Sequence, residues 1–381
     1  MMKITVAIPT ISGREKYLSS CLMTCTSQGC DELEILVSDN SINHSARKIV
    51  EQFQDKRIKY VNPPRYLPIS KHWDFVVSQI SGKIFTIIGD DDGLMPGSMN
   101  RVQEIIQQNG LNIIHHSLCN YFWTDYQEAN LKNKIIFFHA GNKNIRVENG
   151  YATFKKFCTG QARYVDGPMV YHNFVPIDIV RSLAKDGVFF RRASPDVYSS
   201  VVLSAACGSY ISTGEFLTIS GQSARSNGVS VRTTGKEGLA FIDEMKINFK
   251  PRFDSKTIQL TLLDCIYEVI DCYQRQEMLV DINIVNHLYK AATETMTISG
   301  FNNKINEIAG IISFALQKQV FITLSFMVLK EVFRRIGITD KNNLDYLSDS
   351  FPNIIACDQS VNDIYQASIF LDAYLKRELC K

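Results

Sequence analysis

The sequence predicts an α/β fold in which helices cover both faces of a mostly parallel sheet, followed by a C-terminal α-helical extension. Strand-like and helix-like segments alternate over the first third of the chain, as in βαβ units. The early strands are apolar along most of their length, which is typical of strands buried on both faces. After about residue 240 helical periodicity replaces the strand signals. We therefore expect two domains, residues 1–235 and 236–381.

The first third of the chain supplies four strands and four helices in regular alternation. The expected strands are 4–8, 33–37, 58–61 and 84–88, and the expected helices are 14–28, 46–54, 72–80 and 98–108. This order predicts a layer that binds a mononucleotide at the carboxyl ends of its strands.

The middle of the chain is less regular. We expect a strand at 111–115, a hairpin or a loop over the site at 121–139, a short helix at 147–158, a helix at 197–207 and strand-like sequence at 211–219. Ser194 is the expected N-cap of the fourth of these segments, with Pro195 at its first helical position. Helices over 257–275, 311–335 and 361–378 complete the prediction.

Composition limits the class of protein. With 381 residues, 45% hydrophobic, the chain can bury a large core, and a net charge of +2 is too small to indicate a nucleic-acid partner. Ten cysteines lack the paired spacing of zinc sites, which favours free thiols in a reducing cytoplasm. The amino terminus lacks signal-peptide features, and no stretch reaches the roughly 18 apolar residues of a membrane span. A cytoplasmic protein is therefore expected.

The segment Gly-Asp-Asp-Asp-Gly at 89–93 follows the expected strand 84–88 directly. Three adjacent carboxylates raise one another's pKa unless a positive charge lies among them. Their hard oxygen atoms suit Mg²⁺ or Mn²⁺, ions that are usually shared with substrate phosphates. A solvated acidic turn is the alternative, but the carboxyl end of a strand in an open α/β sheet is where ligands bind. The triplet therefore predicts a metal-bound, phosphorylated substrate.

Other polar residues are expected at the same edge of the sheet. Pro9 and Thr10 end the first strand and Arg14 opens the next helix, while Asp39 ends the second strand. Backbone amides and a strand-end carboxylate there can contact a nucleoside. Asp196, at the start of a helix, is the fourth contributor; its alternative role is to cap that helix.

Two basic residues are candidates for binding a diphosphate. Arg225 lies in a polar segment and can make forked hydrogen bonds to phosphate, and Lys71 lies between the third strand and the triplet. A solvated arginine on a loop is the alternative for Arg225. The pair His115 and His116 is expected only to satisfy local hydrogen bonds.

With these motifs in place, the chain resembles the family 2 glycosyltransferases of the GT-A (Rossmann-like) fold, and in particular bacterial members that build surface polysaccharides. The resemblance rests on residues 6–10 with Arg14, on 35–41 and on 89–96. It covers about the first 110 residues well and extends more loosely to Ser220. The segments 194–199 and 226–228 also resemble sequences of those members.

The resemblance implies an inverting transfer of a sugar from a nucleoside diphosphate to an acceptor hydroxyl. The Asp-X-Asp loop of such enzymes holds Mn²⁺ or Mg²⁺ against the diphosphate, and Asp196 would be the general base. Asp39 would contact the base or ribose, while Asp90 and Asp92 would flank the metal and the sugar. If the loop is aligned on the downstream proline instead, Asp91 becomes the direct ligand.

Two other functions stay open on the sequence alone. One is nucleotidyl transfer to a sugar phosphate, although residues 9–14 are a poor version of its glycine-rich phosphate loop. The other is sugar-nucleotide binding without catalysis. The expected acceptor is a saccharide or lipid-linked saccharide. The C-terminal helices would shape the acceptor side, form a homo-oligomer contact or contact the inner face of the plasma membrane peripherally; for the stretch 317–335 a buried bundle helix is favoured over interfacial binding.

Overall fold

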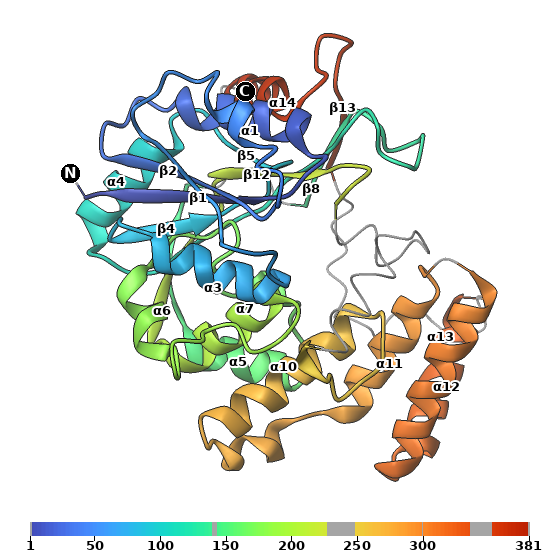
Figure 1. Ribbon diagram of the computed structural model, residues 1–381. Coiled ribbons are helices and arrows are strands. Elements are labelled where there is room, and N and C mark those ends of the chain that lie inside the picture. The colour runs from blue at the N-terminus through green and yellow to red at the C-terminus, as the bar shows by residue number, and fades with distance from the viewer. Residues whose placement is uncertain (1, 139–142, 227–247, 299, 336–352, 380–381) are drawn as a thin grey trace.

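A five-stranded, mostly parallel sheet forms the centre of the computed structural model (Figure 1). The structure describes residues 2–138, 143–226, 248–298, 300–335 and 353–379. The strand order is β10-β4-β1-β2-β3, and β10 alone pairs in the antiparallel direction. The strands are β1 Ile4–Thr10, β2 Leu33–Asp39, β3 Ile58–Val61, β4 Ile84–Ile87 and β10 Val175–Pro176. The predicted α/β fold with a mostly parallel sheet is confirmed.

Helices cover both faces of this sheet, because side chains of each strand alternate between two apolar clusters. Val6 and Ile8 of β1 pack in one cluster with residues of α1 and α4, whereas Ala7 between them packs in the other, with residues of α3 and α7. The helices are α1 Glu15–Thr26, α2 Arg47–Val50, α3 Ile69–Gln79, α4 Ser98–Asn109 and α7 Pro195–Ala206. The sequence predicted each of them, but α2 is only four residues long.

Two smaller sheets extend the central one. The first has the order β6-β11-β9 and the second β13-β8-β7-β12-β5. Their strands are β5 Gly93–Leu94, β6 Ile114–His116, β7 Asn120–Phe122, β8 Lys134–Phe137, β9 Ile145–Asn149, β11 Ser209–Thr213, β12 Thr218–Gln222 and β13 Asn353–Ala356. The antiparallel pair β7–β8 confirms the hairpin alternative, while the single strand expected at 211–219 is two strands in different sheets.

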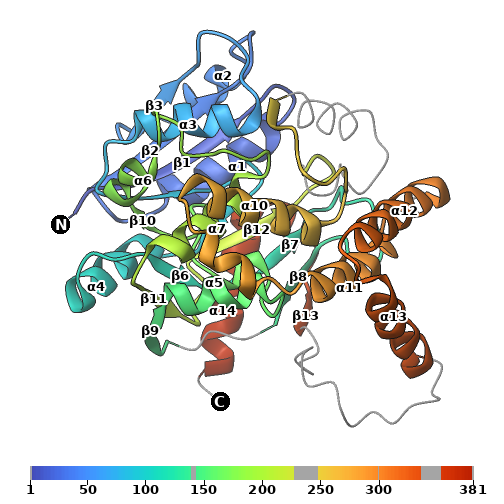
Figure 2. The ribbon, with the colours of Figure 1, turned by 90° about the horizontal axis from the view of Figure 1, so that it is seen from below.

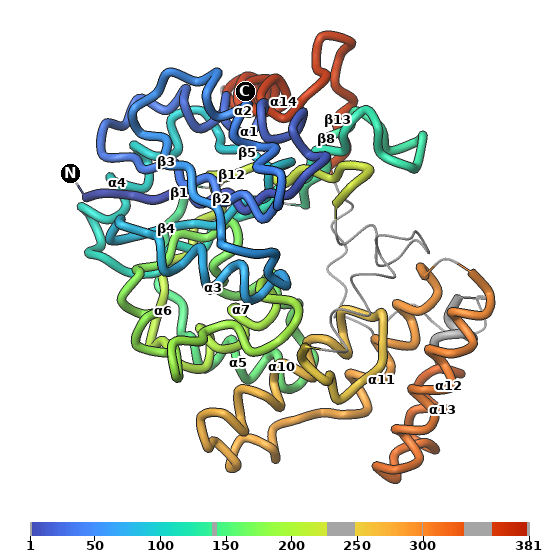
Figure 3. The backbone as a smooth tube through the Cα atoms, viewed as in Figure 1, coloured from blue at the N-terminus to red at the C-terminus, as the bar shows by residue number. Residues whose placement is uncertain are grey.

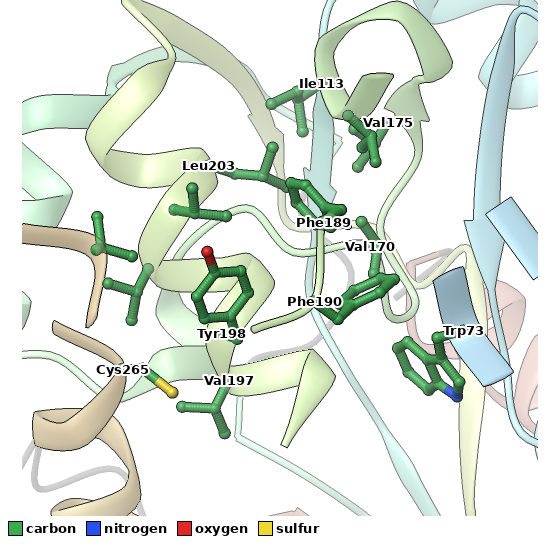
Figure 4. Close-up of a cluster of buried hydrophobic side chains, with 14 of the residues drawn as sticks. Trp73, Ile113, Val170, Val175, Phe189, Phe190, Val197, Tyr198, Leu203 and Cys265 are labelled. Atoms are coloured by element: carbon green, nitrogen blue, oxygen red, sulfur yellow. The ribbon is translucent and has the colours of Figure 1, made fainter. Parts of the chain in front are cut away.

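The larger apolar cluster joins the central sheet to the helices that follow it. Tyr198 of α7 lies among Phe189, Val197 and Cys265, and Cys265 belongs to α10 (Figure 4). Ser194 occupies the N-cap position as expected, but its side chain makes no capping hydrogen bond. The helices of this region are α5 Gly150–Cys158, α6 Ile177–Leu183 and α10 Ile258–Cys272, with short 3₁₀ turns at Tyr164–Asp166 and Gln276–Asp281.

Helices α11 Ile284–Thr295, α12 Phe301–Gln317 and α13 Phe321–Arg335 form an arm that projects from the sheet-containing body (Figures 1 and 2). The single helix expected at 311–335 is two helices, because the chain turns at Gln319, whose φ is 57°. The end of the chain lies back on the body: β13 pairs with β8, and α14 Ile364–Leu379 lies beside α1 (Figure 3). The boundary predicted near residue 235 lies outside the described residues.

Two further sequence expectations concern the environment of the chain. Within the described ranges, none of the helices combines the length and apolar character that crossing a membrane requires. The nine cysteines there are free thiols, most of them buried, in line with the expectation from their spacing.

Candidate active site

A cavity of about 1940 Å³ opens at the carboxyl ends of β1 and β4 and reaches the start of α7 and α10. The structure brings most of the predicted site residues to its wall: Pro9, Thr10, Arg14, Asp90, Asp91, Asp196 and Arg225. Parallel pairing explains this, because Thr10 stands opposite Asp39 and the triplet follows the neighbouring strand β4. The wall therefore combines carboxylates and guanidinium groups from four distant parts of the chain.

Asp90 is paired with a positive charge. Its carboxylate accepts hydrogen bonds of 2.6 Å from Thr10 Oγ1 and 2.6 Å from the Arg14 guanidinium, and its residue is 1% exposed. Burial raises the pKa of Asp90 to about 6, although Arg14 and these hydrogen bonds oppose the shift. Arg14 stays charged. Burial lowers its pKa, but the carboxylates of Asp90 and Asp91 raise the pKa by more than burial lowers it. Asp90 and Arg14 thus form a buried ion pair at the cavity wall.

Arg225 lies beside this ion pair. Its guanidinium donates to the Gly13 carbonyl oxygen at 2.8 Å, and its own carbonyl oxygen accepts from the Arg14 guanidinium. Gly13 has a φ of 86°, a left-handed conformation that suits glycine. Two arginines that are distant in the sequence therefore lie together at the cavity, and guanidinium groups can make forked hydrogen bonds to phosphate.

Asp91 differs from Asp90 in its partners. Its Oδ2 accepts hydrogen bonds of 2.6 Å from each of the hydroxyl groups of Ser223 and Ser226, and its Oδ1 lies 4.0 Å from the Arg14 guanidinium. Burial raises the pKa of Asp91, and the neighbouring Asp92 contributes to this rise while Arg14 opposes it. The carboxylate of Asp91 therefore lies at the cavity wall, and its hydrogen-bond donors are neutral hydroxyl groups.

Asp92 points into the protein and does not belong to the cavity wall. Its residue is 0% exposed, and its carboxylate accepts from the backbone N–H groups of Gly89 at 2.6 Å and Gly221 at 2.7 Å. It also accepts from the Tyr171 hydroxyl at 2.5 Å and faces His172 Nε2 at 3.3 Å. Burial by itself raises the pKa of Asp92, but these partners outweigh it and hold the pKa below its usual value. In this arrangement the carboxylate of Asp92 holds the loop through contacts within the protein.

Tyr171 and His172 are site residues that the sequence analysis missed. His172 is 1% exposed, has a φ of 66° and places its Nδ1 2.7 Å from Thr218 Oγ1. A non-glycine residue in that conformation is uncommon and persists only where surrounding contacts fix it. Neither residue belongs to a helix or strand, so no periodicity in the sequence could indicate them.

Asp196 lies in the first turn of α7 and lines the cavity, as expected. Burial raises the pKa of its carboxylate, although hydrogen bonds from Tyr164 and from backbone N–H groups at the start of the helix oppose the rise. A carboxylate whose pKa is raised is a better proton acceptor than an ordinary aspartate. The position also satisfies the alternative role, since a negative charge here stabilises the helix.

An ion-pair network joins the segment before Asp196 to α10. Arg192 contacts Asp264 at 3.0 Å and Glu268 at 2.5 Å, and Arg252 contacts the same two carboxylates at 3.3 and 3.5 Å. The Ser70 hydroxyl of α3 donates to the Arg192 carbonyl oxygen at 2.5 Å. The network was not predicted, because its acidic residues lie more than one element away from Arg192 in the sequence. It fixes the approach to α7 from two sides.

Besides Asp92, two predicted residues lie away from the cavity wall. Asp39 is 0% exposed and accepts from the backbone N–H of Ser41 at 2.9 Å, the N–H of Ala46 at 3.0 Å and the Tyr60 hydroxyl at 2.9 Å. These contacts order the turn after β2, and Asn40 beside it lines the cavity. Lys71 lies on the outer side of α3, exposed, in a separate depression. Their predicted contacts with the nucleotide remain predictions.

The donor set at the triplet fits a hard divalent cation that shares its coordination with a diphosphate. Within the described residues, no group of three or more His, Cys, Asp or Glu side chains is arranged to hold a metal ion alone. Mg²⁺ and Mn²⁺ need only one or two carboxylates when phosphate oxygens and water complete the shell. A Cβ atom added to Gly89 would lie 2.9 Å from Asp92 Oδ2, 3.0 Å from Asp91 Oδ1 and 3.2 Å from the Tyr171 hydroxyl, so a larger residue at this position would displace these groups.

Comparison with known proteins agrees with this geometry. Residues 5–162 match the family model described as Glycosyl transferase family 2, a range that holds the first strands and the triplet. A curated relative from Campylobacter jejuni, GalNAc(5)-diNAcBac-PP-undecaprenol beta-1,3-glucosyltransferase, is 29% identical over 107 residues. The aligned part is 27% of this chain and 34% of the relative, so the similarity spans about a third of that protein's length.

Solved structures show weaker similarity over a longer range. S. aureus TarS 1-349 in complex with UDP-GlcNAc is 11% identical with a TM-score of 0.45, covering 94% of this chain and 98% of that one. The mannosyltransferase PcManGT from Pyrobaculum calidifontis, in complex with GDP-Man and Mn²⁺, is 11% identical with a TM-score of 0.40, covering 88% and 87%. Superpositions at these scores do not by themselves establish a shared fold.

Proposed function

Since residues 5–162 of this chain belong to glycosyl transferase family 2, we propose that the protein transfers a sugar from a nucleoside diphosphate to an acceptor hydroxyl in bacterial surface polysaccharide or glycolipid synthesis. One observation supports this above the others: Asp91 and Asp196 line the same cavity as Arg14 and Arg225. A site for glycosyl transfer needs groups that bind a diphosphate and a base that accepts a proton, and this wall offers both.

The donor would bind at the carboxyl ends of β1 and β4. Pro9 and Thr10 would meet the nucleoside, and Arg14 and Arg225 would face the diphosphate with charge-assisted hydrogen bonds. Asp91, together with the phosphate oxygens, would hold Mn²⁺ or Mg²⁺, which when bound stabilises the negative charge of the leaving diphosphate. The proposal departs from the sequence expectation at Asp92, whose carboxylate already accepts hydrogen bonds from Gly89, Gly221 and Tyr171.

The acceptor hydroxyl would approach Asp196. Because burial raises the pKa of this carboxylate, it can take the hydroxyl proton as the new glycosidic bond forms and the bond to the diphosphate breaks. Attack from the face opposite the leaving group would invert the anomeric centre. A saccharide or a lipid-linked saccharide is the proposed acceptor; the Campylobacter relative is named for an undecaprenol-linked substrate, which supports the second class.

The test is the variant Asp196→Asn, assayed for sugar transfer and for binding of the donor. We expect turnover to fall roughly 10²-fold or more, the scale of a lost general base, while donor affinity stays near that of the parent. The acid limb of the pH profile, which reports this carboxylate, should disappear in the variant. Asp178→Asn is the matched control, because Asp178 is also an acidic residue in the first turn of a helix but is exposed on α6.

The products distinguish the remaining alternatives. Release of a nucleoside diphosphate from a panel of sugar nucleotides supports glycosyl transfer, whereas release of pyrophosphate would support nucleotidyl transfer. Binding of sugar nucleotides without any turnover would favour a non-catalytic protein. If Asp196→Asn and the control turn over equally fast, Asp196 is not the base.

A further inference from the structure

Helices α12 and α13 each carry more apolar surface than their packing uses. Ile311 and Ala315 of α12 and Leu324 of α13 are buried in a cluster with residues of α10 and α11. One such stripe is enough to hold a helix against a protein core. A second stripe on the same helices therefore calls for another explanation.

The second stripe faces solvent. On α12 it consists of Phe301, Ile305, Ile312 and Leu316, which are 78%, 50%, 37% and 57% exposed; on α13 it consists of Ile322, Phe326 and Leu329, which are 84%, 70% and 52% exposed. Steps of three, four and seven residues place the members of each set on one side of their helix. We call these seven residues the outer face. No described segment of the chain covers it.

The position of the outer face also argues against its burial by the other described segments. α12 and α13 lie at the end of the arm, on the side away from the central sheet (Figures 1 and 2). Exposed apolar side chains that gather on one side of a helix mark a contact with another protein or with a membrane. Large side chains such as Phe301 and Phe326 would otherwise remain in water at a cost in free energy.

Charge selects between the two kinds of partner. Among the described side chains of residues 301–330, the basic ones are Lys304, Lys318 and Lys330, and the acidic one is Glu307. Glu307 is 7% exposed and accepts hydrogen bonds from the Ser255 hydroxyl and the Lys256 backbone N–H, so it does not offset the lysines at the surface. In a second copy of the chain the same described stretch would offer no exposed acidic side chain to these lysines, whereas anionic lipid headgroups complement them.

We propose that the outer face of α12 and α13 binds the surface of a bilayer that contains anionic lipid. The aromatic and aliphatic side chains enter the boundary between headgroups and acyl chains, and Lys318 and Lys330 contact the headgroups. The proposal goes beyond the proposed function and does not depend on it, because binding requires neither donor nor acceptor. For the stretch 317–335 the sequence favoured a buried bundle helix over interfacial binding, and the proposal adopts interfacial binding instead.

The experiment measures co-sedimentation of the full-length protein with phosphatidylcholine vesicles, with and without phosphatidylglycerol. We expect binding to the anionic vesicles and a fall of about tenfold or more in the triple variant F301S/I322S/F326S, which removes three of the most exposed members of the outer face. The matched control is I42S/V147S/V280S, which removes three equally exposed apolar residues from other surfaces and should bind like the parent. Circular dichroism checks that both triple variants remain folded.

Charge and oligomeric state supply the remaining outcomes. K318E/K330E should weaken binding to anionic vesicles and remove its dependence on salt. The proposal is overturned if the parent does not sediment with anionic vesicles, or if F301S/I322S/F326S binds as well as the control. It is also overturned if light scattering shows a stable oligomer that F301S/I322S/F326S dissociates, because the outer face would then join copies of the chain. None of these results touches release of nucleoside diphosphate, which tests the proposed function separately.

Discussion

Asp91 and Asp92 are adjacent, yet replacing each by its amide isostere should have opposite effects on stability. Asp92→Asn alters a carboxylate whose two oxygens accept from the backbone N–H groups of Gly89 and Gly221 and from the Tyr171 hydroxyl. An amide has a single oxygen, so its NH₂ group must face at least one of these donors. Asp91→Asn alters a carboxylate that, among the described residues, accepts from two hydroxyl groups, which can rotate to suit either end of the amide.

The contacts set the magnitudes. Each buried donor left without an acceptor costs about 1–3 kcal/mol. Asp92→Asn creates one or two such donors. It also removes a negative charge that the partners of Asp92 stabilise, as its lowered pKa indicates. We therefore expect the free energy of unfolding to fall by about 2–4 kcal/mol, out of a total of about 5–15 kcal/mol for an ordinary domain. Asp91→Asn removes a charge that burial disfavours, so its stability should be unchanged or rise by about 1 kcal/mol.

Urea unfolding at neutral pH without metal or nucleotide measures both changes. A second measurement, the affinity for UDP and GDP with and without Mn²⁺, should show that Asp91→Asn loses the effect of the metal. Suppose instead that Asp92→Asn unfolds like the parent and also loses the metal effect. Asp92 would then be the metal ligand. The assignment of Asp91 as the ligand and of Asp92 as the residue that holds the loop, which rests on their hydrogen bonds, would be refuted.

Three other variants test further parts of the structure. Asp74 is more than half buried, and burial raises its pKa to about 6. Because the pKa of the folded state exceeds that of the unfolded state, stability falls as pH rises from about 4 to about 6. In urea unfolding, Asp74→Asn should therefore be about 1–2 kcal/mol more stable than the parent at pH 7.5 and equally stable at pH 4. Gly89→Ala brings a Cβ within 3.0 Å of Asp91 Oδ1. By displacing this carboxylate it should weaken Mn²⁺-dependent binding of UDP or GDP about tenfold or more, whereas Gly29→Ala, where nothing lies within 4 Å, should bind normally. Arg192→Met breaks a buried ion-pair network and should lower the free energy of unfolding by about 1–3 kcal/mol. Its kcat should fall by a larger factor than its KM for the donor rises. Arg47→Met, which breaks an exposed ion pair, should have a free energy of unfolding within about 0.5 kcal/mol of the parent.

The central sheet was predictable because its signal is local. The strands around Val6, Ile35 and Ile84 are apolar on both faces and alternate with helices, a pattern that few other folds produce. What was missed depends on distant partners or on backbone conformation. β13 is a strand because it pairs with β8, which is distant in the sequence. The helix predicted at 311–335 is divided into α12 and α13 at Gln319, whose left-handed conformation interrupts the helix but not the apolar periodicity.

The candidate site was predictable to the level of its segments but not of its individual side chains. Strand ends and the triplet located the cavity, because parallel strands bring their carboxyl ends to one edge. Sequence could not say that Asp39 turns into the protein to order its own turn, or that Lys71 lies on the outer side of α3. These outcomes depend on side-chain direction within a turn or a helix, which residue type alone does not determine.

The electrostatic balance of the triplet predicts different roles for its three carboxylates. Burying like charges is costly unless each is compensated. Asp90 has the guanidinium of Arg14 at 2.6 Å, and Asp92 has two backbone N–H groups, a tyrosine hydroxyl and the imidazole of His172. Asp91 has two serine hydroxyls, and the guanidinium of Arg14 only at 4.0 Å. Of the two carboxylates of the triplet that line the cavity, Asp90 and Asp91, Asp91 thus has the less compensation, and a divalent cation arriving with the donor would supply the missing positive charge.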